Sequence, residues 1–236
     1  MGAPRNGAAV AWEVAGMANT PGLRVERAQQ RAPKSDRPLS TREALMDDLA
    51  VVADALERFN SIGLKPLIGG SFASSAWGQP RQTHDLDITV HIRPEHVDAI
   101  VAAFQDDYMV SRTEIDAALA EGKWPASFQL LHFEATFKID VFLSENLAYN
   151  RLVAERAVPA EIIPGVQGWY VSAEDIVLMK LRWYELGNRV SDRQWNDLVQ
   201  VIDVQGPAFD RDYLLRWAEH FEVKSLAGEA LKEALN

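Results

Sequence analysis

The chain has no cysteine among its 236 residues, so it can form neither a disulfide nor a thiolate nucleophile or metal ligand. Its five histidines include no His-Glu-x-x-His pair, which argues against structural zinc. No uninterrupted apolar run approaches the roughly 18 to 20 residues that a membrane helix needs, and the N-terminus has no compact apolar signal segment. The last two absences predict a soluble, cytoplasmic protein with no membrane partner, whereas the absence of cysteine by itself decides little about compartment.

Basic residues are scarce relative to acidic ones. Lys and Arg number 24 and Asp and Glu 34, which gives a formal net charge of -10 and a pI near 5.0. Such a balance disfavours a broad basic face that follows a nucleic-acid backbone. A small molecule or a protein is therefore favoured over RNA as the partner.

Several familiar nucleotide and hydrolase signatures are also absent. The chain has no Gly-x-x-x-x-Gly-Lys-Ser/Thr loop, and residues 69–73, Gly-Gly-Ser-Phe-Ala, lack the last glycine of a hydrolase elbow. His84 precedes Asp85, but a His-Asp phosphohydrolase places that pair on a helix with further histidine ligands. Here the pair falls on an expected strand, which disfavours that class.

The composition divides the chain into three parts. Residues 1–38 hold Gly, Ala, Pro, Arg and Gln without periodicity, and cannot bury enough apolar surface to offset their ordering entropy. We expect a disordered arm there, with a partner-binding strap as the alternative, and Met17 leaves open whether the arm is native. Residues 39–165 read as an α/β domain and residues 166–236 as a helical region.

Local patterns predict the elements of these parts. The Ser40-x-x-Glu43 capping box opens a helix that stops near Gly63. After Ser172 the pattern is helical, and Ser172 and Ser191 have the spacing of N-caps, with Gly187 as a stop. Between them the sequence predicts a strand at 64–70, a helix from 71, a strand at 85–92, a helix from 94, and strands at 128–133 and 136–143. The expected fold class is α/β (α+β), a mixed sheet flanked by helices with a C-terminal helical bundle.

The most informative segment spans residues 69–90. Gly69, Gly70 and Ser71 form a turn that opens a helix, whose N-terminal N–H groups can bind phosphate. Asp85 and Asp87 follow in an apolar strand and point to the same face, about 6.6 Å apart along the backbone. Two carboxylates so placed repel each other, and a divalent ion removes that repulsion.

A third acid, Asp140, lies inside the apolar run Phe-Lys-Ile-Asp-Val-Phe at 137–142. Burying three acids on adjacent strands without a counter-charge is destabilising. A metal site explains their presence, although Asp-x-Asp alone also occurs in calcium loops, in sugar-nucleotide glycosyltransferases and as paired surface acids. The glycosyltransferase reading gives no reason for Gly-Gly-Ser upstream of the two acids.

Residues 64–143 resemble the DNA polymerase β-like nucleotidyltransferase superfamily, whose members carry Gly-Ser, then Asp-x-Asp/Glu between apolar residues, then a third carboxylate on a neighbouring strand. Arg81, Thr83, Asp85, Leu86 and Asp87 form the Arg-x-Thr-x-Asp-Leu-Asp string of its small bacterial minimal and toxin-associated members. Residues 172–202 resemble the helical region of those proteins, in which a helix lysine and a later Asp recur. The likeness covers about two-thirds of the chain.

The resemblance implies transfer of a nucleoside monophosphate, with AMP favoured, from a nucleoside triphosphate such as ATP to an acceptor hydroxyl, with release of pyrophosphate. It implies two Mg²⁺ ions, with Mn²⁺ as a substitute, held by the catalytic residues Asp85, Asp87 and Asp140. The turn Gly69-Gly70-Ser71 would hold the β- and γ-phosphates. The family also suggests a protein partner of the toxin–antitoxin kind.

Several assignments stay open at this stage. Lys180 is either a triphosphate contact or a solvated helix lysine, and Arg81 either binds phosphate or pairs with an acid on the sheet. Glu134 is a substitute for Asp140 as third carboxylate. The four tryptophans that lie among regular apolar positions are interpreted as packing residues: Trp77, Trp183, Trp195 and Trp217. The rival function is a nucleotide-binding module of the same fold that has lost turnover.

Overall fold

The computed structural model describes residues 41–135, 137–144 and 148–234. The expected N-terminal arm and the first residue of the capping box, Ser40, lie outside the described residues. The strands are β1 (Leu67–Ile68), β2 (Asp85–Val90), β3 (Tyr108–Met109), β4 (Ser127–His132), β5 (Lys138–Leu143), β6 (Val158–Ile163) and β7 (Val166–Tyr170). The helices are α1 (Thr41–Ser61), α2 (Gly70–Trp77), α3 (Val97–Phe104), α4 (Arg112–Glu121), α5 (Ala148–Arg156), α6 (Ala173–Leu186), α7 (Asp192–Gln205), α8 (Arg211–His220) and α9 (Lys224–Ala234), with short 3₁₀ turns at Pro94–His96 and Gly206–Ala208.

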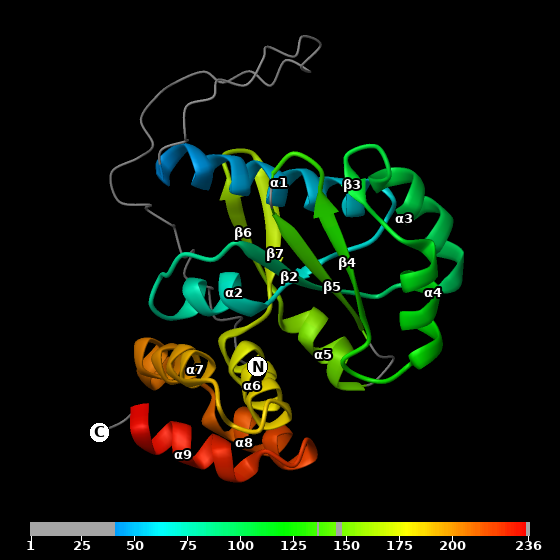
Figure 1. Ribbon diagram of the computed structural model, residues 1–236. Coiled ribbons are helices and arrows are strands. Elements are labelled where there is room, and N and C mark those ends of the chain that lie inside the picture. The colour runs from blue at the N-terminus through cyan, green and yellow to red at the C-terminus, as the bar shows by residue number, and fades with distance from the viewer. Residues whose placement is uncertain (1–40, 136, 145–147, 235–236) are drawn as a thin grey trace, which may run out of the picture.

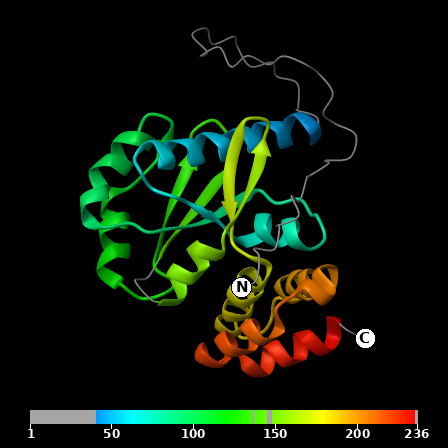
Figure 2. The ribbon, with the colours of Figure 1, turned by 180° about the vertical axis from the view of Figure 1, so that it is seen from behind.

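The strands form one mixed sheet in the order β3-β4-β5-β2-β1-β7-β6 (Figure 1). The pairs β2–β5 and β1–β7 are parallel, and the other four pairs are antiparallel. The mixed α/β class expected from the sequence is therefore confirmed. The helices α6 to α9 gather at one end of the molecule, below the sheet in Figure 1 and again in the reverse view of Figure 2.

The two central strands have one apolar and one polar face, because side chains alternate along a strand. Leu86, Ile88 and Val90 of β2 are fully buried, as are Ile139 and Val141 of β5. They belong to one continuous apolar core that also includes residues of α1, α3 and the C-terminal helices. The residues that alternate with them, which include the acids, share the opposite face: Asp85, Asp87 and Thr89 of β2, and Lys138, Asp140 and Phe142 of β5.

The C-terminal helices begin where the sequence predicts. The hydroxyl oxygen of Ser172 accepts a hydrogen bond from the N–H of Asp175 (3.2 Å), and that of Ser191 accepts one from Gln194 (3.3 Å). Gly187 is the C-cap of α6. Both N-caps and the stop are confirmed. No helix in the described part of the chain is long and apolar enough to cross a membrane.

Several regions differ from the expected elements. The sequence patterns did not predict β3, α4, α5 or the β6–β7 hairpin. The second strand of the expected 128–143 pair begins at Lys138, while Thr136, where it was expected to begin, lies outside the described residues. Strand β7 belongs to the sheet through β1, by the parallel register of Ile68 with Tyr170. Nine of the eleven residues in the two strands of this hairpin face solvent or are only partly buried, so its sequence lacks the apolar run of a central strand.

Candidate active site

The Gly-Gly-Ser turn packs directly on the acidic strand. The N–H of Gly69 donates to the backbone oxygen of Asp87 (2.9 Å), and α2 begins at the next residue. Gly70 has φ +52°, and a Cβ atom there would lie 1.7 Å from Asp87 Oδ2. Only glycine fits this position, for both reasons. The expected phosphate-binding turn and the expected metal-binding strand are therefore in direct contact.

Three carboxylates lie on the polar face of the two central strands. In the parallel pairing of β2 with β5, Asp85 is in register with Lys138 and Asp87 with Asp140. Paired strands lie about 4.8 Å apart, so the side chains of Asp87 and Asp140 are neighbours. Glu134 lies in the connection between β4 and β5, outside this register, so Asp140 is the third acid that the sheet places beside Asp87.

The three carboxylates repel one another, and the charged form of Asp87 is the least favourable. Burial and then the negative charges of Asp85 and Asp140 together raise the pKa of Asp87 to about 6, against the weaker effect of the positive charges of Lys180 and Lys138. An acid that protonates near neutrality is poorly compensated by its surroundings. Asp87 is thus the member of the group that gains most from a bound cation.

The other two acids have hydrogen-bond donors. Thr83 donates its hydroxyl to Asp85 Oδ1 (2.6 Å). Asp140 accepts from the side-chain amide of Gln129 at Oδ1 (2.8 Å) and from the Lys138 ammonium at Oδ2 (2.6 Å). Both oxygens of Asp140 are therefore engaged.

The donor set fits a hard cation, because carboxylate oxygens are the protein ligands that Mg²⁺ prefers. In the described part of the chain, no group of three or more His, Cys, Asp or Glu side chains is arranged to hold a metal ion. The contacts of Asp140 with Gln129 and Lys138 occupy one lone pair on each of its two oxygens. The residues thus fit Mg²⁺ in type and in register, and Asp85 and Asp87 are the pair that is not blocked by a lysine.

A second charged network links the turn to the C-terminal helices. Arg81 donates from Nε and Nη2 to the two carboxylate oxygens of Asp197 in α7, both at 2.9 Å, and from Nη2 to the hydroxyl oxygen of Ser71. Lys180 in α6 donates to the same carboxylate (2.9 Å) and to Gln194 (2.9 Å). Because Arg81 uses an acceptor lone pair of Ser71, the hydroxyl hydrogen of Ser71 remains available as a donor.

The interpretation of Lys180 as a solvated lysine is wrong, since its exposure is only 3%. Burial lowers its pKa, while the adjacent Asp197 acts in the opposite direction. For Asp197 itself burial raises the pKa, but the hydrogen bond from Arg81 and the charge of Lys180 outweigh it and hold the pKa below its usual value. Of the two alternatives for Arg81, a phosphate contact or an ion pair with an acid on the sheet, the structure shows an ion pair, but with an acid of helix α7.

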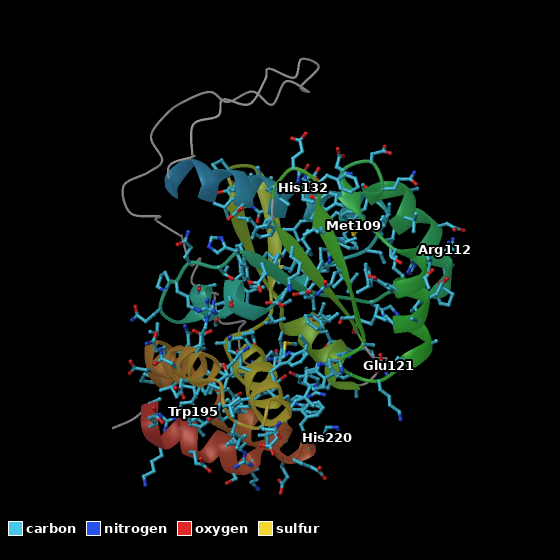
Figure 3. All side chains as sticks on the ribbon, viewed as in Figure 1. Met109, Arg112, Glu121, His132, Trp195 and His220 are labelled. Atoms are coloured by element: carbon cyan, nitrogen blue, oxygen red, sulfur yellow. The ribbon has the colours of Figure 1, made fainter. Side chains whose placement is uncertain are left out.

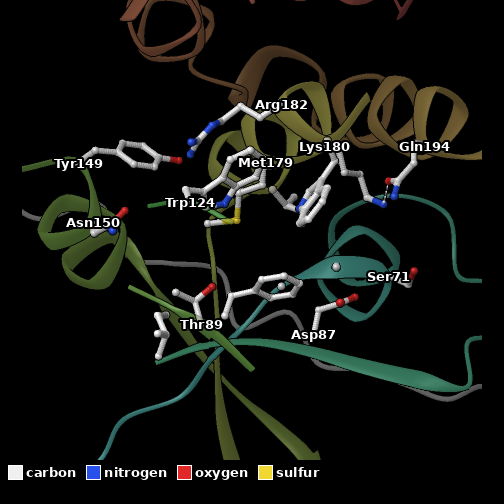
Figure 4. A pocket seen from close by; sticks show the side chains of 16 residues that line it. Ser71, Asp87, Thr89, Trp124, Tyr149, Asn150, Met179, Lys180, Arg182 and Gln194 are labelled. Carbon is white, nitrogen blue, oxygen red and sulfur yellow. Dashed lines mark hydrogen bonds between the residues drawn. The ribbon is translucent and has the colours of Figure 1, made fainter. Parts of the chain in front are cut away.

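A cavity of about 250 Å³ opens between the sheet's polar face and α6 (Figure 4). One end is formed by Ser71, Asp87, Lys180 and Gln194. The other end is lined mainly by large side chains, with Thr89 and Asn150 as polar neighbours: Trp124, Phe142, Tyr149, Met179, Arg182 and Trp183. Asp87 is the one acidic residue that lines the cavity in the described part of the chain.

The aromatic end of the cavity is built from ring contacts. The Trp183 ring lies 5.0 Å from that of Trp124 and 5.6 Å from that of Phe142, measured between centroids. The guanidinium carbon of Arg182 lies 3.8 Å from the Trp124 centroid. Tyr149 donates a hydrogen bond from its hydroxyl to the buried carboxylate of Asp175 (3.1 Å), which orients its ring. These side chains line one end of the cavity.

Trp183 packs against Trp124 and Phe142, as predicted, and it also lines the cavity. The sequence pattern did not single out Trp124. The other three predicted packing residues make these contacts: Trp77 donates its indole N–H to the backbone of Val171 (2.8 Å), Trp195, labelled in Figure 3, donates to Glu233 of α9 (2.9 Å), and Trp217 packs against Tyr149. Apolar spacing along a helix does not distinguish a cavity wall from a core, because both faces are apolar.

Comparison with known proteins gave solved structures only. No family model matches the chain, and no curated protein matches it. The solution structure of the antibiotic-resistance factor ANT(2'')-Ia is similar at 16% identity with TM-score 0.49, covering 80% of this chain and 95% of that one. An antigenic nucleotidyltransferase-like protein from Paracoccidioides brasiliensis is similar at 16% identity with TM-score 0.45 (83% and 95% covered). Lincomycin-bound LnuA, a lincosamide antibiotic adenylyltransferase, is similar at 13% identity with TM-score 0.44 (67% and 96% covered).

Proposed function

We propose that this protein is a Mg²⁺-dependent nucleotidyltransferase that moves a nucleoside monophosphate from a nucleoside triphosphate to an acceptor hydroxyl and releases pyrophosphate. The observation that carries the proposal is the contact between Gly70 and Asp87. It places a helix N-terminus suited to phosphate against a strand with two carboxylates, and a third carboxylate, Asp140, is in register with Asp87.

The residues have distinct roles in this proposal. Ser71 and the N–H groups of the Gly69–Gly70 turn bind the β- and γ-phosphates, and Lys180 contributes positive charge at the same end of the cavity. Asp85, Asp87 and Asp140 hold two Mg²⁺ ions, which stabilise the negative charge that develops on the transferred phosphoryl group. Asp140 also accepts the proton of the attacking hydroxyl. Arg81 acts on the phosphates only through Ser71, since it is paired with Asp197.

We further propose that the nucleotide is ATP and that the acceptor is a small molecule or a protein. The aromatic end of the cavity favours a planar or apolar group, and Arg182 and Lys180 at the cavity disfavour a polycation. The excess of acidic residues places RNA last among the acceptors. The cytoplasm supplies both ATP and Mg²⁺, and we place the protein there.

The test is a labelling experiment. The protein is incubated with each NTP labelled on the α-phosphate, with Mg²⁺ or Mn²⁺ and a host lysate, and the lysate is then separated into small molecules, protein and RNA. We expect a metal-dependent label from ATP in one of the first two fractions, and none with Asp87→Asn. Transfer by Asp87→Asn at the wild-type rate would contradict the proposed mechanism.

The alternative is a nucleotide-binding module without turnover. The observation that favours it is the engagement of both Asp140 oxygens, by Lys138 and Gln129. In that case ATP binds, but no fraction becomes labelled, and Asp140→Asn leaves ATP affinity unchanged. A label that depends on Asp140 excludes this alternative.

A further inference from the structure

Lys138 lies within the carboxylate group itself. It precedes Asp140 by two residues in β5, so both side chains point to the same face of the sheet. Its ammonium nitrogen is 2.6 Å from Asp140 Oδ2, and its backbone is in register with Asp85 of the neighbouring strand. Lys138 is thus placed among all three acids.

The charges around Lys138 explain why it stays there. Its pKa is raised, first by the hydrogen bond to Asp140 and then, after the opposing effect of burial, by the charges of Asp140, Asp85 and Asp87. Lys180, which approaches the cavity from α6, is already paired with Asp197. The single charge of Lys138 and one divalent ion together balance three carboxylates.

We propose that Lys138 is an internal counter-ion that occupies the Asp140 end of the metal site. The nucleotide-free protein then binds one divalent ion, at Asp85 and Asp87, and the Asp140 end accepts a second ion only when Lys138 is displaced. An incoming triphosphate provides the displacing charge, because it attracts the lysine and the second ion alike. This inference rests on the proposed function, and it makes uptake of the second ion depend on the nucleotide.

Lys138→Met removes the charge but keeps an unbranched side chain, and it provides the test. Binding of Mn²⁺ to nucleotide-free protein is measured from the EPR signal of the free ion. We expect one bound ion for the wild type, and two for Lys138→Met, with the second bound roughly tenfold or more tighter than in the wild type. Lys138→Arg, which keeps the charge, and Lys224→Met, which changes an exposed lysine paired with Glu219, should behave as the wild type.

A second measurement does not involve metal. In EDTA, Lys138→Met should melt below the wild type because three carboxylates lose their counter-ion, and adding Asp140→Asn should restore part of the loss. Equal Mn²⁺ stoichiometry and affinity in the wild type and Lys138→Met would overturn the inference. The variant Asp87→Asn separates the two proposals. If this variant no longer binds Mn²⁺, the proposed metal site is supported whatever the result for Lys138. If it binds Mn²⁺ as the wild type does, the proposed function fails as well.

Discussion

At the scale of single residues, Gly70 is the position with the least freedom. Ala at Gly70 must adopt φ +52° and also displace Asp87, and we expect Gly70→Ala to lower the free energy of unfolding by about 3 to 5 kcal/mol, as strain plus overpacking. Urea unfolding measures this. Gly122→Ala is the matched control, since Gly122 has φ +58° and its nearest neighbour is 4.0 Å away. It should lose only the strain, about 1 to 2 kcal/mol. If both variants lost the same unfolding free energy, the clash of the added methyl group with Asp87 would contribute nothing to the loss at Gly70.

Asp87 gives a prediction for stability against pH. Its pKa is 3.8 in the unfolded chain and about 6 in the fold, so between pH 4 and 6 the native state binds more protons than the unfolded state. The unfolding free energy should therefore fall as pH rises through this window, and above it Asp87→Asn should be more stable than the wild type by about 3 kcal/mol. The measurement is urea unfolding in EDTA at pH 4, 5 and 7.

The exposed Asp203 on α7 is the control for this experiment. Asp203→Asn should follow the wild-type curve across the whole pH range. If Asp87→Asn were no more stable than the wild type at pH 7, the acids would already be compensated without a metal ion.

At the scale of elements, Asp197 holds the loop after α2 and the helix α6 on α7. Asp197→Asn leaves Arg81 and Lys180 without their shared carboxylate, and we expect a loss of about 3 kcal/mol in unfolding free energy. A higher KM for ATP should accompany it, because Ser71 and Lys180 lose their support. Thermal or urea unfolding and steady-state kinetics measure the two effects.

The double variant Asp197→Asn with Lys180→Ala is the control, since it removes one of the two unpaired cations. It should be more stable than Asp197→Asn alone. If the double variant were less stable than Asp197→Asn by as much as Lys180→Ala destabilises the wild type, Asp197 and Lys180 would not be energetically coupled.

The sequence predicted the helices and strands in which apolar residues recur with a clear period, and it did not predict those without such a period. Strand β2 and the helices after Ser172 were predicted from alternation and capping. The hairpin β6–β7 has mixed burial, and its place at the edge of the sheet follows from packing on β1 rather than from its own residues. Local pattern is informative only where one face is buried throughout.

The site shows the same division. The three acids and the glycine turn could be proposed from the sequence, because their spacing has chemical meaning. The roles of Lys138, Asp197 and Trp124 could not, since each depends on partners brought near by strand register or by helix packing. For Asp197 the sequence contained a weak signal, because a helix lysine and a later Asp recur in the helical region that residues 172–202 resemble.

At the scale of the whole molecule, the proposed function makes nucleotide binding depend on charge. The net charge of -10 and the three acids of the site repel a triphosphate until cations lie between them. We expect calorimetry to show ATP binding with Mg²⁺ and much weaker binding in EDTA. Equal affinity in the two conditions would indicate a metal-free binding module.

The parallel ladder between β2 and β5 has a consequence for how the protein can be engineered. The spacing of Asp87 and Asp140 is set by interstrand hydrogen bonds and not by the length of chain between them. Residues 91–137, which carry α3, α4 and β4, can therefore tolerate insertions or deletions in their connections without changing the distance between the acids. A circular permutation with new termini in the turn at 105–107 keeps β2 and β5, and it offers a way to exchange the cavity-lining segment around Trp124 while the acids and the Gly-Gly-Ser turn are left intact.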